Sequence, residues 1–121
     1  MRRKPGELIP LEVEVLEAAV ALQGEGILDF HGYSLAKSMK TRSGRRMLTA
    51  HGTLYRALHR LERAKLLEAF WEDPSGAEQE GRPRRRLYRL TALAAFALNR
   101  ARSGERASSE LRSIEGGLEA P

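Results

Sequence analysis

Apolar residues recur with helical spacing over the first quarter of the chain. Between Pro10 and Gln23 they fall at i, i+4, i+7 and i+11, beginning at Leu11, and further apolar residues widen the stripe around the cylinder. A stripe this wide predicts a helix that other elements cover on several sides. Gly24 and Gly26 are expected to end it.

The next segment contains a short apolar run and then a second amphipathic pattern. Residues 27–30 predict a short strand or a packed turn. A second helix is expected to begin near His31, with Leu35 and Met39 on its apolar face. The polar run 40–46 after it is expected to be a flexible, basic loop.

A third helix is expected to follow Thr49, whose hydroxyl suits the N-cap position. At about 100° per residue, Leu54, Leu58 and Leu61 lie on one face and predict its contact with the core. The opposite face is polar and basic, and consists of Gly52, Thr53, Arg56, His59, Arg60 and Arg63. An ordinary solvated face mixes charges of both signs, but here only Glu62 lies near the arginines. The pattern therefore favours contact with nucleic acid.

Two short runs with strand character come next, at 67–72 and 85–90, joined by turn residues from Asp73 to Pro83. The connection is too long for a tight hairpin, so we expect its tip to be mobile. Pro83 fixes its own φ and biases Arg82 toward an extended conformation, which predicts a guanidinium that projects outward. An arginine on such a loop suits DNA phosphates or a narrow minor groove.

From Thr91 the chain is again helical by propensity, with Leu93, Phe96, Ala97 and Arg100 on one side. For the residues beyond this segment, a longer helix and a disordered tail are both compatible with the sequence.

Charge is distributed unevenly along the chain. The 121 residues include 21 Lys and Arg against 16 Asp and Glu, a net charge of +5. From Arg82 to Arg89 there are five arginines and no acidic residue, whereas residues 7–17 contain four glutamates and no base. The length suits one domain. A concentrated basic segment in such a domain favours a polyanionic partner.

Several function classes are not supported. The chain has no cysteine, which suits a reducing cytoplasm, and it shows neither an export segment nor an apolar run of about 18 residues. His31, His51 and His59 lack the spacing and carboxylate partners of a metal site. No nucleophile with a base and no pair of catalytic carboxylates is visible. We therefore expect a cytoplasmic protein that is not an enzyme and has no cofactor or metal.

The aromatic residues allow two interpretations, core packing or the stacking of a ligand or base, and this holds for Tyr33, Tyr55, Trp71 and Tyr88. Tyr55 lies at the edge of the leucine face, where its ring packs and its hydroxyl reaches toward a phosphate. Trp71 is at a strand end beside the loop, and we expect it to pack in the core.

Three segments resemble the PadR family of transcriptional regulators and occur in the family's order. They are HGYSLA at 31–36, GTLYRALHRLE at 52–62 and GRPRRRLYRLT at 81–91, and the resemblance spans about residues 10–102. It implies a winged helix-turn-helix domain, a C-terminal helix that exchanges contacts across a two-fold dimer, and repression as the usual mode of action. By this resemblance the third helix is the recognition helix, and Arg82 and Arg84 lie on the wing.

The chain departs from the family at Lys65, where glycine is usual after the recognition helix. A Cβ would strain a left-handed residue there, so the third helix is expected to run on by a residue or two. The C-terminal region lacks the tryptophan of drug-binding relatives, which leaves a small-molecule effector open but unsupported.

We therefore predict a mainly α protein with a small β-hairpin wing. Its expected parts are a flexible N-terminal arm (1–9), a winged helix-turn-helix DNA-binding domain (10–91), a C-terminal dimerisation helix (92–115) and a disordered tail (116–121). The expected function is a PadR-like repressor that binds a double-stranded operator as a homodimer. The alternatives are a non-specific nucleic-acid-binding protein, architectural or RNA-binding, and a winged helix used as a protein-interaction module.

Two sets of residues carry this prediction. Those expected to contact DNA are Tyr33, Thr49, His51, Gly52, Thr53, Tyr55, Arg56, His59, Arg60, Arg82, Arg84 and Arg85. Those expected to contact a second subunit are Leu11, Val15, Leu93, Phe96, Ala97 and Arg100.

Overall fold

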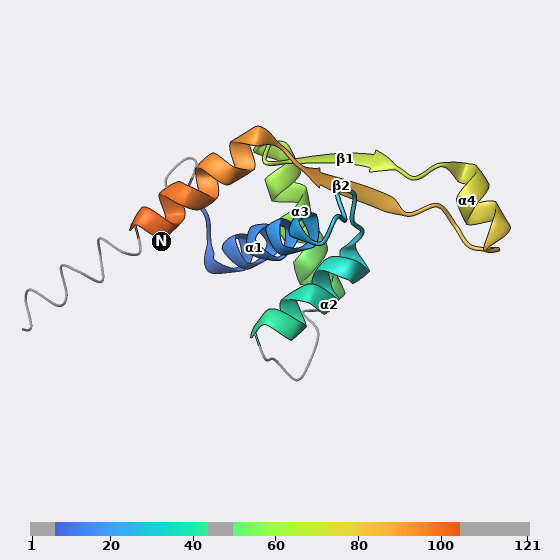
Figure 1. Ribbon diagram of the computed structural model, residues 1–121, viewed down its shortest axis with the longest axis horizontal. Helices are drawn as coiled ribbons and strands as arrows, with labels where there is room; N and C mark the ends of the chain where they lie inside the picture. Colours follow the sequence, from blue (N-terminus) through green and yellow to red (C-terminus); the bar gives the residue numbers. More distant parts are fainter. Residues whose placement is uncertain (1–6, 44–49, 105–121) are drawn as a thin grey trace, which may run out of the picture.

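The computed structural model describes residues 7–43 and 50–104 (Figure 1). Within these ranges the elements are α1 (Pro10–Gly24), α2 (Gly32–Ser43), α3 (His51–Arg63), β1 (Leu67–Trp71), α4 (Pro74–Gln79) and β2 (Arg86–Leu90), followed by a helix over residues 92–104. The predicted fold class, mainly α with a small β-hairpin, is confirmed.

Helix α1 is the central element of the helical body. It begins with Pro10 in its first turn, and the Glu12 carboxylate accepts a hydrogen bond from the Ile9 N–H at 3.1 Å. Val15 and Leu16 are fully buried, because α2, α3 and β2 all pack against this helix. The predicted burial of α1 on several sides is confirmed.

The core is formed by apolar residues from the three body helices and the hairpin. Phe30, Leu35, Leu54 and Leu58 are each at most 2% exposed. Burying one such side chain contributes about 1.5–3 kcal/mol relative to leaving it in water. Leu61 completes the predicted apolar face of α3 in this core.

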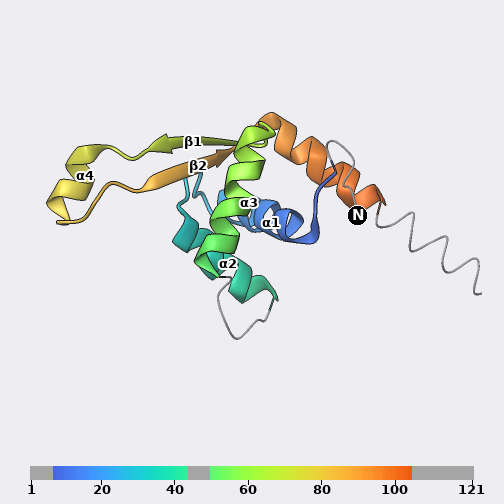
Figure 2. The ribbon, with the colours of Figure 1, turned by 180° about the vertical axis from the view of Figure 1, so that it is seen from behind.

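The hairpin pairs β1 and β2 in antiparallel fashion, with Leu67 opposite Leu90 and Trp71 opposite Arg86. On the other side of β2, Phe30 and Tyr88 exchange two backbone hydrogen bonds of 3.0 and 2.8 Å. The base of the hairpin is thereby fixed to the body. Its outer end extends away from the helices and bears α4 at the tip (Figures 1 and 2); we call residues 67–90 the wing.

The connection between the strands contains helix α4, so the expectation that turn residues alone fill it is wrong. Asp73 caps α4 by accepting a hydrogen bond from the Ser75 N–H at 2.9 Å, and Pro74 occupies the first turn. Gly81 follows the helix with a φ of 65°, a left-handed conformation that glycine adopts without strain. These are ordinary helix boundaries, but the same residue types also form turns, so the sequence pattern alone does not separate the two.

Two other expected boundaries also differ from the structure. Helix α2 continues to Ser43, so the first part of the run predicted as a loop is helical. Helix α3 does not run on: it ends at Arg63, and Lys65 itself adopts a φ of 66°. The Lys65 N–H donates to the Glu62 carbonyl and the Leu66 N–H to the Leu61 carbonyl, both at 3.0 Å, so the backbone turn is retained despite the Cβ.

The last described helix, residues 92–104, packs on the body through Ala94 and Leu98, each 2% exposed. The rest of the predicted dimerisation helix, the predicted tail and residues 1–6 of the arm lie outside the described residues. Among the described helices, none combines the length and apolar character needed to cross a bilayer.

Candidate nucleic-acid interface

The outward face of α3 is a stripe of exposed residues. At about 100° per residue, Gly52, Arg56, His59 and Arg63 fall within roughly 60° of one another, and all four are exposed. A Cβ on Gly52 would meet no atom within 4 Å, so the backbone here is open to close approach. Within the described residues, no ion pair holds Arg56 or Arg63. The helix therefore presents two unneutralised guanidinium groups to solvent.

Arg60 does not belong to this stripe, which corrects the sequence prediction. It lies on the flank of α3 nearest α1, where its Nε donates to the Glu12 carboxylate at 2.8 Å. Glu12 is 2% exposed, and its carboxylate also accepts the hydrogen bond from the Ile9 N–H. Because a buried carboxylate requires a partner of this kind, Arg60 holds α3 against α1. Thr53, also predicted to contact DNA, is half-buried.

The start of α3 is open at its backbone. The N-cap position is Ala50, one residue after the predicted Thr49, and no side chain caps it; Thr49 lies outside the described residues. The first-turn N–H groups and the helix dipole therefore give this end a partial positive charge that suits an anion. The exposed ring of His51 lies 4.4 Å from the ring of Tyr55, centroid to centroid.

Tyr55 connects α3 to the start of α2. A Cβ on Gly32 would lie only 2.5 Å from the Tyr55 hydroxyl oxygen, so the half-buried ring occupies space that only glycine leaves open. The Tyr55 ring packs against the core, as predicted, and its hydroxyl lies beside the first residue of α2. Contact of this hydroxyl with a phosphate stays a prediction.

The beginning of α2 meets the wing. The Nδ1 atom of His31 accepts a hydrogen bond from the Ser34 N–H at 3.3 Å, and its Nε2 lies 3.4 Å from an Arg85 guanidinium nitrogen. Burial, and then the nearby Arg85 charge, lower the pKa of His31 below its usual value. Tyr33, 64% exposed, stacks beside His31 with ring centroids 6.4 Å apart. Tyr33 and Arg85 are thus brought together at one edge of the body.

Arg82 is held by carboxylates and does not project outward as predicted. Its guanidinium forms ion pairs with Glu72 and Glu80, and only 22% of its side chain is exposed. The same interaction lowers the pKa of Glu72 to about 2 and raises that of Arg82. Arg82 therefore joins the residue after β1 to the residue after α4, and its charge is neutralised within the wing.

Two further arginines lie nearer the shaft of the wing, one exposed and one paired. Within the described residues, Arg84 has no carboxylate partner, and Arg86 reaches Glu62 of α3 at 3.4 Å. Both guanidinium groups lie over the Trp71 ring, which is 55% exposed, so the expectation that Trp71 packs in the core is wrong. Trp71 and Arg86 were missing from the predicted site, although alternation along β2 places Arg84, Arg86 and buried Tyr88 on one face.

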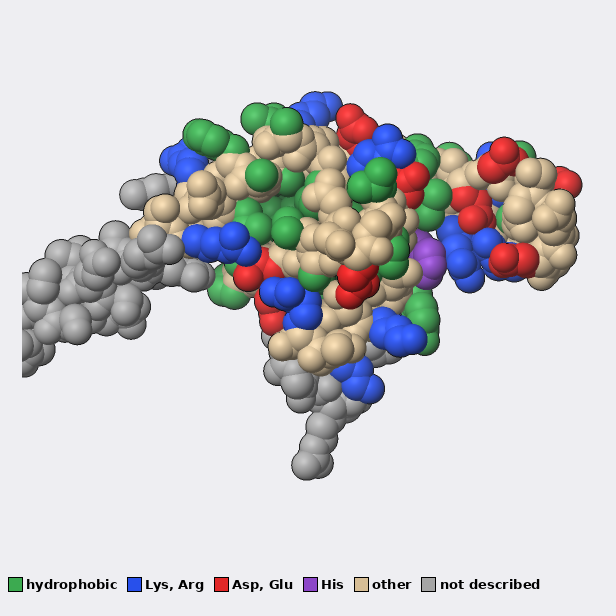
Figure 3. All heavy atoms as spheres, in the orientation of Figure 1, with side chains coloured by type: hydrophobic (Ala, Val, Ile, Leu, Met, Phe, Trp, Pro, Cys, Tyr) green, Lys and Arg blue, Asp and Glu red, His purple; other side chains and the backbone are tan. Residues whose placement is uncertain are grey.

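Surface charge differs along the wing. Figure 3 shows acidic side chains gathered at its far end, with basic ones beside them. The exposed carboxylates there are those of Asp73, Glu78 and Glu80. The tip of the wing is therefore a poor phosphate ligand, whereas its shaft carries positive charge.

The residues predicted to contact a second subunit fall into two groups. Leu93 and Phe96 are 55% and 65% exposed, and Arg100 is also exposed. Val15, by contrast, is fully buried within α1 and has no surface to offer a partner, which corrects its assignment. Leu11 and Ala97 are half-buried, and both pack against the core.

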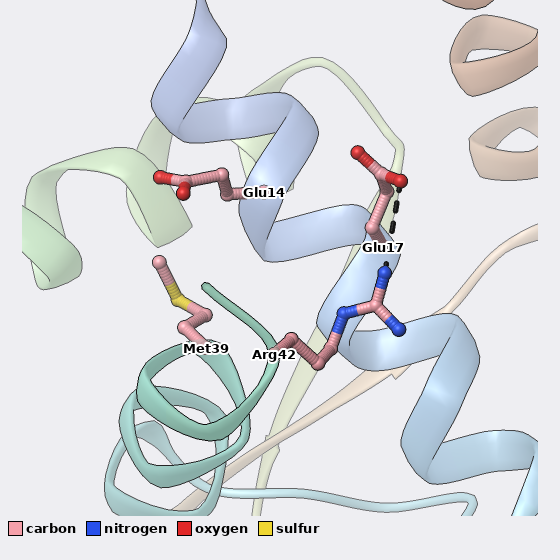
Figure 4. A pocket seen from close by; sticks show the side chains of 4 residues that line it. All are labelled: Glu14, Glu17, Met39 and Arg42. Carbon is pink, nitrogen blue, oxygen red and sulfur yellow. Dashed lines mark ion pairs between the residues drawn. The ribbon is translucent and has the colours of Figure 1, made fainter. Parts of the chain in front are cut away.

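A small pocket lies between α1 and α2 and is lined by Glu14, Glu17, Met39 and Arg42 (Figure 4). Its volume is about 160 Å³, below the roughly 300–1,000 Å³ of ligand sites. Glu17 pairs across it with Arg42 at 3.7 Å and with Arg102 of the last helix at 3.4 Å. The pocket adds no argument for a small-molecule effector.

Comparison with known proteins identifies a family and a fold. A sequence model of the transcriptional regulator PadR-like family matches residues 26–98. A search of curated proteins returned no match. Similar solved structures include a transcriptional regulator from Clostridium thermocellum, 16% identical with a TM-score of 0.66, which covers 86% of this chain and 87% of its own. A PadR-family regulator from Eggerthella lenta is 21% identical, with a TM-score of 0.61 and coverages of 88% and 82%. The clock-associated protein Pex from Anabaena is 23% identical, with a TM-score of 0.52 and coverages of 92% and 90%.

Proposed function

Since the chain belongs to the PadR-like family of transcriptional regulators, we propose that it is a homodimeric repressor that reads an operator with α3 and grips the flanking backbone with its wing. Members of this family regulate transcription by binding DNA and are not enzymes, so the protein is a DNA-binding regulator. The proposal concerns the residues that bind, the dimer and the sign of regulation. We expect the protein to act in the cytoplasm.

The observation that carries the proposal is the exposed stripe on α3. An α-helix fits the major groove, and residues near its N-terminus reach base edges. Here His51, Gly52 and Arg56 are exposed at that end, and Arg56 has no ion pair among the described residues. Tyr33 at the start of α2 and Arg85 on the wing both lie against His31, where they suit phosphates.

The dimer is supported by the exposed apolar side chains of the last helix. Leu93 and Phe96 lie one helical turn apart and are each more than half exposed, and neighbouring apolar groups on a surface are typical of a contact with another protein. Two rigidly spaced modules would read half-sites about one helical turn apart, which gives specificity that a single module lacks. A dimer bound to an operator that overlaps a promoter would exclude RNA polymerase from that promoter.

DNA recognition is tested by fluorescence anisotropy of a labelled duplex from upstream of the protein's own gene, against a shuffled duplex, at about 150 mM salt. We expect the first duplex to bind at least about a thousandfold more tightly. Equal, strongly salt-dependent binding to this and other candidate promoters would favour a non-specific binder. Binding to no duplex would favour a protein-interaction module.

The dimer is tested by sedimentation of the double variant Leu93→Ala/Phe96→Ala. We expect the wild type to sediment as a dimer and the variant as a folded monomer, because the variant loses exposed apolar contacts. Leu28→Ala, which also removes an exposed leucine, at 54% exposure, is the control and should stay dimeric. A variant that remains dimeric would overturn this interface.

A further inference from the structure

Trp71 is the only tryptophan of the chain and stands on the surface of the wing. More than half of it is exposed, at the outer end of β1, away from the helical body. Isolated exposed leucines are common, whereas tryptophan is enriched among the residues that contribute most to binding at contact sites.

The neighbours of Trp71 are cationic. Arg86 is its direct cross-strand partner, and Arg84 precedes it by two residues. Their guanidinium carbons lie 5.2 and 5.6 Å from the centroid of the ring, within the range of a cation–π interaction. The ring therefore holds two long side chains in place, which lowers the entropy that they would lose on meeting a ligand.

The cluster faces the same side as the recognition helix. Alternation along β2 puts Arg86 on the face of Tyr88, whose ring is buried in the body. Arg86 also reaches Glu62 near the end of α3. The Trp71 cluster, defined as Trp71, Arg84 and Arg86, is thus the continuation of the inner face of the wing beyond the helical body.

The distribution of charge along the wing also favours the Trp71 cluster over the tip as the surface that meets a polyanion. Residues 72–82 contain four carboxylates and one arginine, and that arginine, Arg82, is paired with two of the carboxylates. The tip therefore repels a polyanion. Arg84, just inside the tip, has no carboxylate partner within the described residues.

We propose that the wing contacts DNA through the Trp71 cluster on its shaft and not through its tip. The indole packs against the sugar and phosphate backbone, and Arg84 binds a phosphate beside it. Arg86, which is paired with Glu62, supports the ring from within the wing. This proposal rests on the proposed function and names a contact residue, Trp71, that the sequence pattern did not assign to DNA.

The test uses the intrinsic fluorescence of Trp71 in the full-length protein, because no other tryptophan contributes. Acrylamide quenching is measured with and without saturating amounts of a duplex whose binding has been established by anisotropy. We expect the quenching constant to fall by about threefold, since anchor residues become desolvated at interfaces. Anisotropy that saturates while quenching is unchanged would overturn this proposal and leave the proposed function intact.

Two other outcomes separate the alternatives. If no duplex binds, both the proposed function and this proposal fail. If the indole becomes protected without DNA as protein concentration rises, a second copy of the chain covers it, and the DNA proposal is overturned.

A matched pair of variants gives a second readout. Trp71→Ala is expected to weaken DNA binding by about tenfold. Phe70→Ala removes an aromatic ring on the opposite face of the hairpin, where Arg89 lies 5.4 Å from the ring centroid, and should change affinity by less than about twofold. Equal effects of the two variants, with unchanged circular dichroism, would contradict a role specific to Trp71.

Discussion

Helix α3 and the wing both carry a series of arginines, and they use them differently. On α3 the helical period separates Arg60, which faces α1 and pairs with buried Glu12, from Arg56, which faces solvent. On the wing, Glu72 and Glu80, which flank α4, hold Arg82, whereas Arg84 is left exposed. In both regions one arginine stabilises the fold and another is available to a partner. Which arginine stabilises the fold is determined by the carboxylates near it, and not by its position in the basic run.

The largest expected effect is on DNA binding by α3. Replacing Arg56 with alanine should weaken operator binding by about 1–3 kcal/mol if its guanidinium contacts a base, with no change in thermal stability. Anisotropy with the operator duplex measures this loss. Arg63→Ala, on the same stripe but at the far end of α3, should have a clearly smaller effect, and equal losses would mean that the stripe contributes only general charge.

The next effect concerns stability and not DNA. Arg60→Ala removes the ion pair between the guanidinium of α3 and the buried Glu12 carboxylate of α1, and should lower the free energy of unfolding by roughly 2 kcal/mol, less than for a fully buried pair because Arg60 is 38% exposed. Urea denaturation gives the value. With Arg63→Ala as the reference, an indistinguishable unfolding midpoint would show that the pair does not hold α3 in place.

A smaller difference is expected within the wing. Arg84→Ala should reduce DNA affinity several-fold at any sequence and lower the slope of log affinity against log salt by about one, since one phosphate contact is lost. Arg82→Ala should change that slope less, because its charge is already neutralised. Titrations at several salt concentrations compare them, and a larger slope change for Arg82→Ala would reverse this assignment.

The junction between the two regions offers a stabilising change. Lys65 has a φ of 66°, which costs a residue with a Cβ about 1–2 kcal/mol, partly offset by the greater freedom of glycine in the unfolded chain. Lys65→Gly should therefore stabilise the protein by about 0.5–1 kcal/mol. A melting temperature below that of the wild type would contradict the left-handed backbone conformation of Lys65.

The smallest expected effect is on pH dependence where α2 meets the wing. The folded state lowers the pKa of His31, so its contribution to stability is complete above the usual value of 6.5 and is lost as the pH falls. His31→Asn keeps a capping side chain that does not titrate. The stability of the wild type relative to this variant should fall between pH 7.5 and 5.5, and a constant difference would exclude a role for His31 protonation.

The helical body could be predicted from the sequence because its apolar spacing is regular. The leucines of α3 and the burial of α1 followed from periodicity alone. Helix α4 did carry its own signals, Asp73 as N-cap, Pro74 and Gly81, but the segment is short and polar, so turn chemistry and helix boundaries look alike.

For the candidate site, the sequence predicted which residue types are present more reliably than it predicted where their side chains point. The exposed stripe of α3 followed from the helical period. The orientations of Arg60 and Arg82 did not follow from it. Arg60 pairs with Glu12, which lies 48 residues away in sequence. Arg82 pairs with Glu72, 10 residues away, and with Glu80 in a turn, and periodicity does not predict the geometry of that turn. Trp71 was placed in the core because its side chain is apolar, yet it lies beyond the reach of the helical body.

The central claim, that α3 and the wing together grip DNA in a two-fold complex, is tested most directly by chemical footprinting of the protein on DNA upstream of its own gene. Methylation protection reports major-groove contacts, and hydroxyl-radical cleavage reports the backbone. We predict two protected major-groove segments about one helical turn apart, each flanked by backbone protection from the wing. Uniform protection without a two-fold pattern, or major-groove protection with no flanking backbone contact, would contradict the account.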